Sequence, residues 1–193
     1  MKLLVQRVKQ ATVTSQGKEL GRIGRGLCVL VCAEEADTEN VLQKMAKKLG
    51  ALRIFEDDAG KMNLSVQDIH GEILLVPQFT LAADCWQGNR PSFVKMGDKA
   101  VTKALFEQFV TLVRGQGIPV QTGVFQADME VALINQGPAT FWITLEQDSV
   151  SPLERQVQEN RPDLTGKQKQ RFLQEAEALR SNLALRQAQK KGV

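Results

Sequence analysis

Short apolar runs, separated by turns that contain glycine and aspartate, fill most of the first 145 residues. Runs of about four to eight apolar residues are typical of β-strands rather than helices. Residues 27–32 are almost uniformly apolar, which indicates a strand buried on both faces. The pattern predicts strands over residues 2–8, 11–15, 19–23, 27–32, 52–55, 73–76, 131–134 and 139–145.

Two stretches repeat their apolar residues at helical spacing instead. The first begins after Asp37 and Thr38, which suit a helix start, and ends at Gly50. Its apolar face contains Val41, Leu42, Met45 and Leu49. The second covers residues 98–114, and its apolar face contains Val101, Leu105, Phe109 and Leu112. Two helices against about eight strands indicate an α+β fold, with a barrel-like sheet and helices on one side.

The chain changes character after Glu146. Residues 147–152 are polar and break structure, and the segment from Gly166 to Lys191 is rich in helix-forming residues. Residues 151–193 contain nine Lys or Arg against five Asp or Glu. We therefore expect a domain over residues 1–146 and a basic helical C-terminal extension over 147–193. A basic tail fits an anionic partner, and a solvated helix of mixed charge fits the same composition.

The length of the apolar runs and the cysteine content narrow the class of protein further. The longest apolar run, residues 27–33, is far short of the roughly 18 residues that cross a bilayer. The three cysteines, Cys28, Cys32 and Cys85, form no C-x-x-C pair, so they indicate neither a disulfide framework nor a zinc site. Cys28 and Cys32 share one face of a predicted strand, which favours buried packing. We expect a reduced, cytoplasmic protein without metal or cofactor.

Several catalytic chemistries find no support in the residues. The chain contains one histidine, His70, which falls in a predicted turn, and no tyrosine. A Ser-His-Asp or Cys-His arrangement would have to use that histidine, and no partner for it stands nearby in the sequence. The sequence also has no phosphate-binding glycine loop of the known patterns.

Amides, hydroxyls and main chain remain as candidate chemistry. Two motifs combine them, each directly after an apolar run: residues 77–80, Pro-Gln-Phe-Thr, and residues 135–140, Asn-Gln-Gly-Pro-Ala-Thr. Proline fixes φ and glycine relaxes it, so a Gly-Pro pair can hold main-chain carbonyls rigid and facing outward. Thr80 and Thr140 fit ordinary strand positions equally well, because threonine favours strands.

The sequence resembles the D-aminoacyl-tRNA deacylases of bacteria and eukaryotes. The resemblance runs from Met1 to about Leu145, and its segments occur in the expected order. They are Gln6-Arg7-Val8, Leu52-Arg53-Ile54-Phe55-Glu56-Asp57, Gly60-Lys61-Met62-Asn63-Leu64-Ser65, Gln78-Phe79-Thr80-Leu81, Arg90-Pro91-Ser92-Phe93, Gly123-Val124-Phe125-Gln126-Ala127-Asp128-Met129 and Asn135-Gln136-Gly137-Pro138-Ala139-Thr140.

The resemblance implies a homodimer with active sites at the subunit interface. It implies a cis peptide bond between Gly137 and Pro138, inserted into the partner's site to exclude L-amino acids, with Arg7 supporting that loop. It further implies that the substrate ester lies near Gln78, Phe79 and Thr80. The terminal adenosine of aminoacylated tRNA would lie against Phe125 and Met129, which a helical turn would bring to one face.

The expected activity is hydrolysis of D-aminoacyl-tRNA, and of glycine mischarged on tRNA-Ala. Pro77 departs from the family, which usually has serine there, and a related deacylase that removes L-alanine carries Pro-Gln at this place. Phe79 and Asn135 match the D-specific branch. Two alternatives stay open: an L-alanyl-tRNA proofreading deacylase and a non-catalytic nucleic-acid-binding module.

Overall fold

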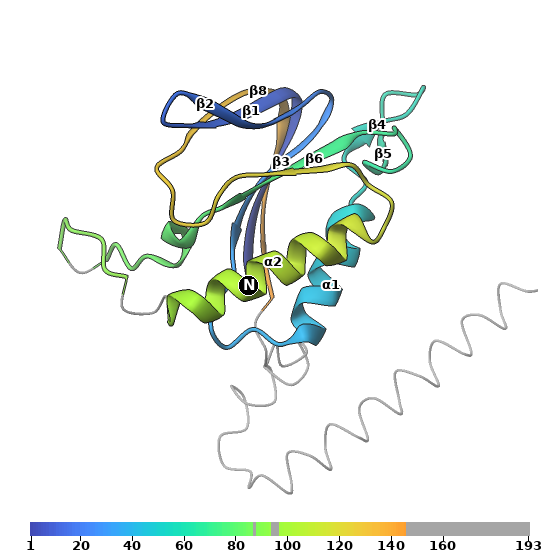
Figure 1. Ribbon diagram of the computed structural model, residues 1–193. Coiled ribbons are helices and arrows are strands. Elements are labelled where there is room, and N and C mark those ends of the chain that lie inside the picture. Colours follow the sequence, from blue (N-terminus) through green and yellow to red (C-terminus); the bar gives the residue numbers. More distant parts are fainter. Residues whose placement is uncertain (87, 94–96, 146–193) are drawn as a thin grey trace, which may run out of the picture. The chain divides into compact units, whose positions relative to one another are not determined.

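The first strand pairs with three other strands and so organises the sheet. The computed structural model describes residues 1–86, 88–93 and 97–145 (Figure 1). Strand β1, Lys2–Ser15, pairs along one edge with β3, Gly26–Cys32, and then with β2, Lys18–Ile23. The predicted break between residues 8 and 11 is wrong. Exposed Lys9 and Gln10 resemble a turn in sequence, but β1 continues through them because its other edge is paired there.

That other edge carries β8, Glu130–Thr144, antiparallel to β1 over nearly its whole length. The sequence predicted two separate strands here, over 131–134 and 139–145. The structure instead makes one strand with a shift of register in the middle, and the shift falls on the Asn-Gln-Gly-Pro-Ala-Thr motif.

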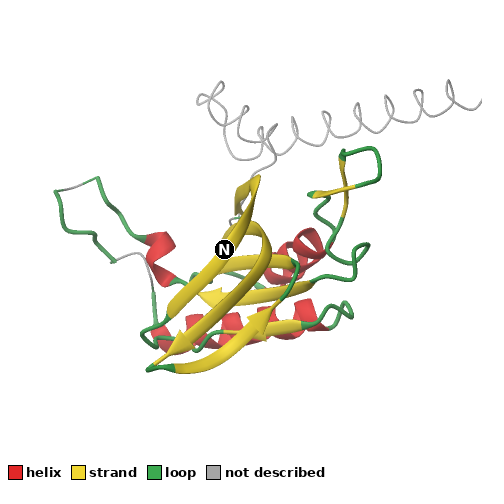
Figure 2. Ribbon diagram, turned by 90° about the horizontal axis from the view of Figure 1, so that it is seen from above, coloured by secondary structure: helices red, strands yellow, loops and turns green. Residues whose placement is uncertain are grey.

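The sheet continues from β3 by parallel pairing. Strand β6, Glu72–Pro77, pairs with β3, and β7, Val120–Thr122, pairs with β6. Gly21 of β2 lies so close to β7 that a Cβ there would come within 3.0 Å of the Gln121 Cβ. The sheet is therefore nearly closed, and Figure 2 shows the strands curving over one another. The predicted α+β fold with a barrel-like sheet is confirmed.

Two helices cover one face of the sheet (Figure 1). Helix α1, Glu39–Gly50, begins after Thr38 and buries the predicted apolar residues. Helix α2, Lys99–Arg114, is capped by the Asp98 carboxylate, which accepts from the N–H groups of Ala100 and Val101. Its predicted face is partly wrong. Phe109 is buried, but Val101 is exposed, and the buried residues are Thr102, Phe106, Phe109, Val110 and Val113.

The apolar interior has two parts. The larger lies between the helices and the sheet, and includes Leu3, Val29 and Leu75 from the strands. The smaller lies on the opposite face of the same strands, where Cys28 and Leu74 pack. Strand β3 faces both parts, which is why its residues are apolar at nearly every position.

The remaining elements are short. The predicted strand over 52–55 is reduced to β4, Phe55–Glu56, which pairs with β5, Met62–Leu64. A 3₁₀ turn, η1, covers Phe79–Ala82 directly after β6. Within the described residues no helix is both long and apolar enough to cross a membrane. The expected helical extension over 147–193 lies outside the described residues.

Candidate active site

The Gly-Pro motif is a bulge on β8. Gln6 of β1 faces Thr140, and Val8 faces Asn135, so the single residue Arg7 faces residues 136–139. The amide of Asn135 donates to the Thr140 hydroxyl at 3.2 Å and joins the two ends of the bulge. The peptide bond between Gly137 and Pro138 is cis, as predicted, and both residues are exposed.

Arg7 anchors this bulge from inside the protein. Its side chain is 2 % exposed, which places a cation in the interior. Its Nε donates to the Gln136 carbonyl at 2.9 Å, and one terminal nitrogen donates to the Ile54 carbonyl at 2.6 Å. The other terminal nitrogen lies 3.5 Å from the Glu56 carboxylate. A planar guanidinium with its donors in a fixed fork can hold three such partners at once.

The second motif continues from the buried end of β6. The Gln78 N–H donates to the Val31 carbonyl at 2.7 Å, which extends the β3–β6 pairing by one bond. The Gln78 side-chain amide donates to the Thr80 hydroxyl at 2.5 Å. The rings of Phe79 and Phe93 meet edge to face, with centroids 5.7 Å apart. Gln78 and Phe79 are thereby half-buried, and Thr80 is exposed.

A cavity of about 370 Å³ opens beside this motif. Its wall contains Val76, Pro77, Gln78, Phe79, Gln126, Ala127, Asp128, Met129 and Val131. Gln78 and Phe79 thus lie beside Met129 in the wall of one cavity. Gly137 and Pro138 do not line this cavity within one chain.

Phe125 and Met129 do not share a helical face, which corrects the expected helical turn. The chain from Gly123 to Met129 is an irregular loop, closed by a bond from the Ala127 N–H to the Val124 carbonyl. Met129 lines the cavity beside Gln78, and Phe125 lines a different cavity against α2. Their assignment to the adenosine stays a prediction.

Two cysteines are buried, and one of them, Cys32, lies close to the site. Burial raises the pKa of Cys28 to about 11. Burial likewise raises the pKa of Cys32 to about 11, and its thiol lies 3.8 Å from the Phe79 carbonyl. Both thiols are protonated at neutral pH and are therefore poor nucleophiles. Sequence reasoning missed the position of Cys32 under Phe79, although the parallel pairing of Val31 with Pro77 accounts for it.

The other candidates supply no catalytic pair. His70 is exposed in a turn with a φ of 50° and lines none of the cavities described. Within residues 1–86, 88–93 and 97–145, no three His, Cys, Asp or Glu side chains gather as metal ligands. Thr140 belongs to the base of the β8 bulge rather than to the cavity.

The fold and the cavity define a class of α+β protein in which a nearly closed sheet presents amides, a hydroxyl and main chain at the Pro-Gln-Phe-Thr motif. The profile of the D-Tyr-tRNA(Tyr) deacylase family matches residues 4–144. A D-aminoacyl-tRNA deacylase of Geobacter sulfurreducens is 50% identical over 151 residues, which cover 78% of this chain and 99% of that protein. One from Desulfitobacterium hafniense is 52% identical over 148 residues, which cover 77% and 99%.

Two solved structures resemble the chain. The structure of a c-Myc DNA Unwinding Element Binding Protein has a TM-score of 0.71 and 38% identity, over 75% of this chain and 99% of that one. A probable eukaryotic D-amino acid tRNA deacylase has a TM-score of 0.66 and 21% identity, over 75% and 98%, and so shows the shared fold alone. The chain belongs to the D-aminoacyl-tRNA deacylase family and is a hydrolase that acts on aminoacyl-tRNA.

Proposed function

We propose that the enzyme hydrolyses the ester between a D-amino acid, or glycine mischarged on tRNA-Ala, and the 3′-terminal adenosine of tRNA in the cytoplasm. The observation that supports this most directly is the exposed Gly137-Pro138 bulge held by buried Arg7. A rigid main-chain feature on the surface can recognise a small ligand by shape, because it does not rearrange on contact.

The proposed chirality filter comes from a second copy of the chain. In this scheme Gly137 and Pro138 of one subunit enter the cavity beside Gln78 of the other, bind the substrate's α-amino group through carbonyls, and leave no space for an L side chain. Exposed apolar residues on β8 support such pairing: Ile134 is 48% exposed and Trp142 51%. Large apolar side chains on an outer strand often mark an interface with another protein.

Exclusion by main chain has two consequences for selectivity. Glycine has no side chain to clash, so glycyl-tRNA should pass the filter. The D side chain would point away from the filter, so rates should depend little on which D-amino acid is attached. Discrimination of this kind arises from repulsion of the wrong substrate rather than from extra attraction to the right one.

The hydrolytic step in this proposal relies on positioning. The Thr80 hydroxyl accepts a hydrogen bond from the Gln78 amide, and an amide donor cannot remove its proton. The substrate's own 2′-hydroxyl would therefore assist the attacking water. The N–H groups of Phe79 and Thr80 lie at the start of η1, where a helical turn leaves donors without internal partners. One such donor to a developing oxyanion is worth about 3 kcal/mol.

Two alternatives follow from specific observations. Pro77 is buried at the end of β6 and has no N–H or side-chain donor, as in the deacylases that remove L-alanine. The 38% identical solved structure is of a protein named for binding a DNA unwinding element, which supports nucleic-acid binding in addition to hydrolysis as the other candidate.

One assay separates the three. The full chain is incubated with D-aminoacyl-tRNA, L-alanyl-tRNA and glycyl-tRNA-Ala in parallel, and release of free amino acid is followed. We expect the D-aminoacyl and glycyl esters to be cleaved and the L-alanyl ester to persist. Preferential cleavage of L-alanyl-tRNA would support the proofreading alternative, and inhibition of cleavage by an added DNA oligonucleotide would support the additional nucleic-acid-binding role.

A further inference from the structure

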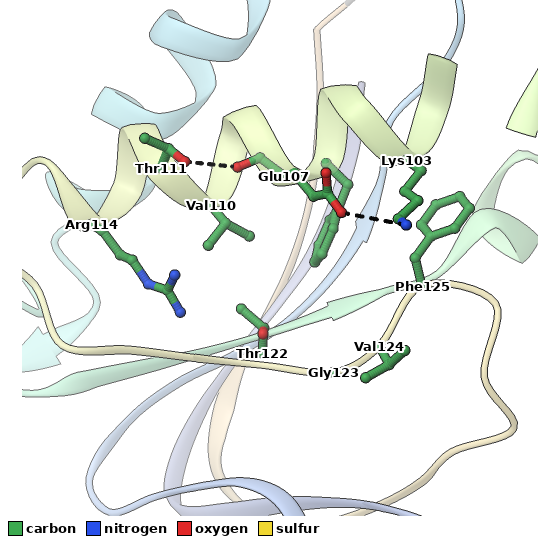
Figure 3. Close-up of a pocket in the computed structure, with 10 residues that line it drawn as sticks. Lys103, Glu107, Val110, Thr111, Arg114, Thr122, Gly123, Val124 and Phe125 are labelled. Carbon is green, nitrogen blue, oxygen red and sulfur yellow. Dashed lines mark hydrogen bonds and ion pairs between the residues drawn. The ribbon is translucent and has the colours of Figure 1, made fainter. Parts of the chain in front are cut away.

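A second cavity lies between α2 and the chain that follows β7. Its volume is about 420 Å³. Figure 3 shows Lys103 and Phe125 together at one end and Arg114 at the other. Phe106 and Val110 add apolar surface between them. The cavity therefore combines two cations with an aromatic ring and an apolar wall.

Charge distinguishes this cavity from the one beside Gln78. The wall of the Gln78 cavity carries one charged side chain, Asp128, which disfavours a phosphate. The wall of the second cavity carries Lys103, Glu107 and Arg114, with a net positive charge. An uncharged nucleoside suits the first wall, and a phosphodiester suits the second.

Both cations in the second cavity can meet an anion. The Lys103 ammonium lies 3.8 Å from the Glu107 carboxylate, and the two side chains are 56% and 64% exposed. Such a long, solvated pair is weak and exchanges readily for another anion. Arg114 donates one bond, at 3.3 Å, to the Val120 carbonyl, which fixes the guanidinium and leaves other donors for a ligand.

The loop of residues 123–129 lines both cavities. Its first residues, Gly123 to Phe125, line the second cavity, and Gln126 to Met129 line the one beside Gln78. A Cβ on Gly123 would meet the Met129 Sδ at 2.7 Å, and the Val124 N–H lies 3.4 Å from the same sulfur. The two walls are therefore packed against each other. A nucleic-acid strand that leaves one cavity along this loop would reach the other.

We propose that the second cavity binds the nucleotide that precedes the terminal adenosine of tRNA. Its phosphodiester would lie at Lys103, and Arg114 would bind the next phosphate along the strand. Its base would pack on Phe125, so this inference assigns Phe125 to the preceding nucleotide and leaves Met129 to the adenosine. A positive groove combined with an aromatic face is the usual means of holding single-stranded nucleic acid. This inference rests on the proposed function, because it assumes that the adenosine occupies the cavity beside Gln78.

The test compares binding of adenosine and of the dinucleotide CpA by calorimetry, without hydrolysis. Three single-charge variants of α2 in the full chain are used: Lys103→Gln, Glu107→Gln and, as the matched control outside the cavity, Lys99→Gln. We expect Lys103→Gln to weaken CpA binding roughly three- to ten-fold, as loss of one phosphate contact does, and to leave adenosine binding unchanged. Glu107→Gln should strengthen CpA binding, and Lys99→Gln should change neither ligand.

The salt dependence of binding is an independent test of the inference. The advantage of CpA over adenosine in the unmodified protein should shrink as salt rises, and Lys103→Gln should reduce that dependence. Equal binding of adenosine and CpA, or an equal effect of Lys103→Gln and Lys99→Gln, would overturn the inference. Failure of the proposed function is a separate result: D-aminoacyl-tRNA would stay intact while CpA binding still responded to residue 103.

Discussion

Arg7 donates from Nε to the carbonyl oxygen of Gln136 at 2.9 Å, on the residue directly before Gly137. One side chain thus connects the middle of β1 to the exposed bulge of β8. The same guanidinium reaches the Ile54 carbonyl and the Glu56 carboxylate, so the bulge is fixed relative to the β4 region as well. Because Arg7 is buried, these bonds are shielded from water and define one position of the bulge.

Replacing Arg7 with Met should affect both stability and selectivity. The carbonyls of Gln136 and of buried Ile54 would lose their donor, and we expect the free energy of unfolding to fall by about 2–4 kcal/mol. Urea titration measures this change. In the folded variant the bulge would be less fixed, so the ratio of D- to L-aminoacyl-tRNA hydrolysis should also fall.

Arg22→Met is the matched control for Arg7→Met. Arg22 lies on the surface of β2 and pairs with Glu19. Its loss should change the free energy of unfolding by no more than about 0.5 kcal/mol and leave the selectivity ratio intact. If Arg7→Met kept full discrimination while folded, the arginine would stabilise the fold without controlling the filter.

Thr80→Ala tests whether the hydroxyl positions the substrate or attacks it. The variant loses one hydrogen bond, to Gln78, so we expect hydrolysis of D-aminoacyl-tRNA to slow by up to about ten-fold. A substrate ending in 2′-deoxyadenosine lacks the assisting hydroxyl and should react at least about 100-fold more slowly. Thr80→Ser, which keeps the hydroxyl, is the control. An inactive Thr80→Ala, together with normal turnover of the deoxy substrate, would contradict the substrate-assisted scheme.

The elements that depend on local signals were predictable from the sequence. Thr38 and the apolar spacing that follows fixed the start of α1, and Asp98 did the same for α2. The apolar run of β3 revealed its burial on both faces. Gln78 and Thr80 were recognisable because an amide and a hydroxyl follow a buried strand, whereas Phe79 was recognisable only through the family resemblance.

Features that depend on contacts between residues far apart in the sequence were not predictable. Lys9 and Gln10 look like a break, and only the partner strand β8 shows that β1 passes through them. The exposed position of Val101 depends on how α2 meets the rest of the protein, which no local pattern records. The separation of Phe125 from Met129 results from the turn between Val124 and Ala127, and sequence spacing alone resembles a helix there.

The buried thiol of Cys28 makes stability depend on alkaline pH. Burial raises its pKa from 9.0 to about 11, so the folded protein keeps a proton that the unfolded chain releases. The stabilisation is complete below pH 9 and is lost as pH rises through about 11. By pH 11 the free energy of unfolding should have fallen by about 2 kcal/mol from this group. Urea unfolding at several pH values with a reductant present measures this decline. Cys32, whose pKa is also raised to about 11, contributes a similar decline. Cys28→Ala should therefore remove about half of the decline, and Cys85→Ala, at an exposed thiol, should leave it unchanged.

Gly26 should tolerate no side chain, because two strands meet at its Cα. It pairs with Val8 of β1 and with Glu72 of β6, and a Cβ on Gly26 would lie 1.9 Å from the Glu72 carbonyl oxygen. Backbone cannot move aside as a flexible side chain does, so Gly26→Ala must force β3 and β6 apart.

We expect Gly26→Ala to lower the free energy of unfolding by more than about 3 kcal/mol, measured by urea titration. Gly24→Ala is the matched comparison in the preceding turn. A Cβ there would meet only the Glu72 carboxylate, at 3.5 Å, and the Gly24 N–H would keep its bond to that carboxylate. Its cost should stay below about 1 kcal/mol. Equal stability of the two variants would contradict the prediction, because it would mean that β3 and β6 leave room for a Cβ on Gly26 beside Glu72.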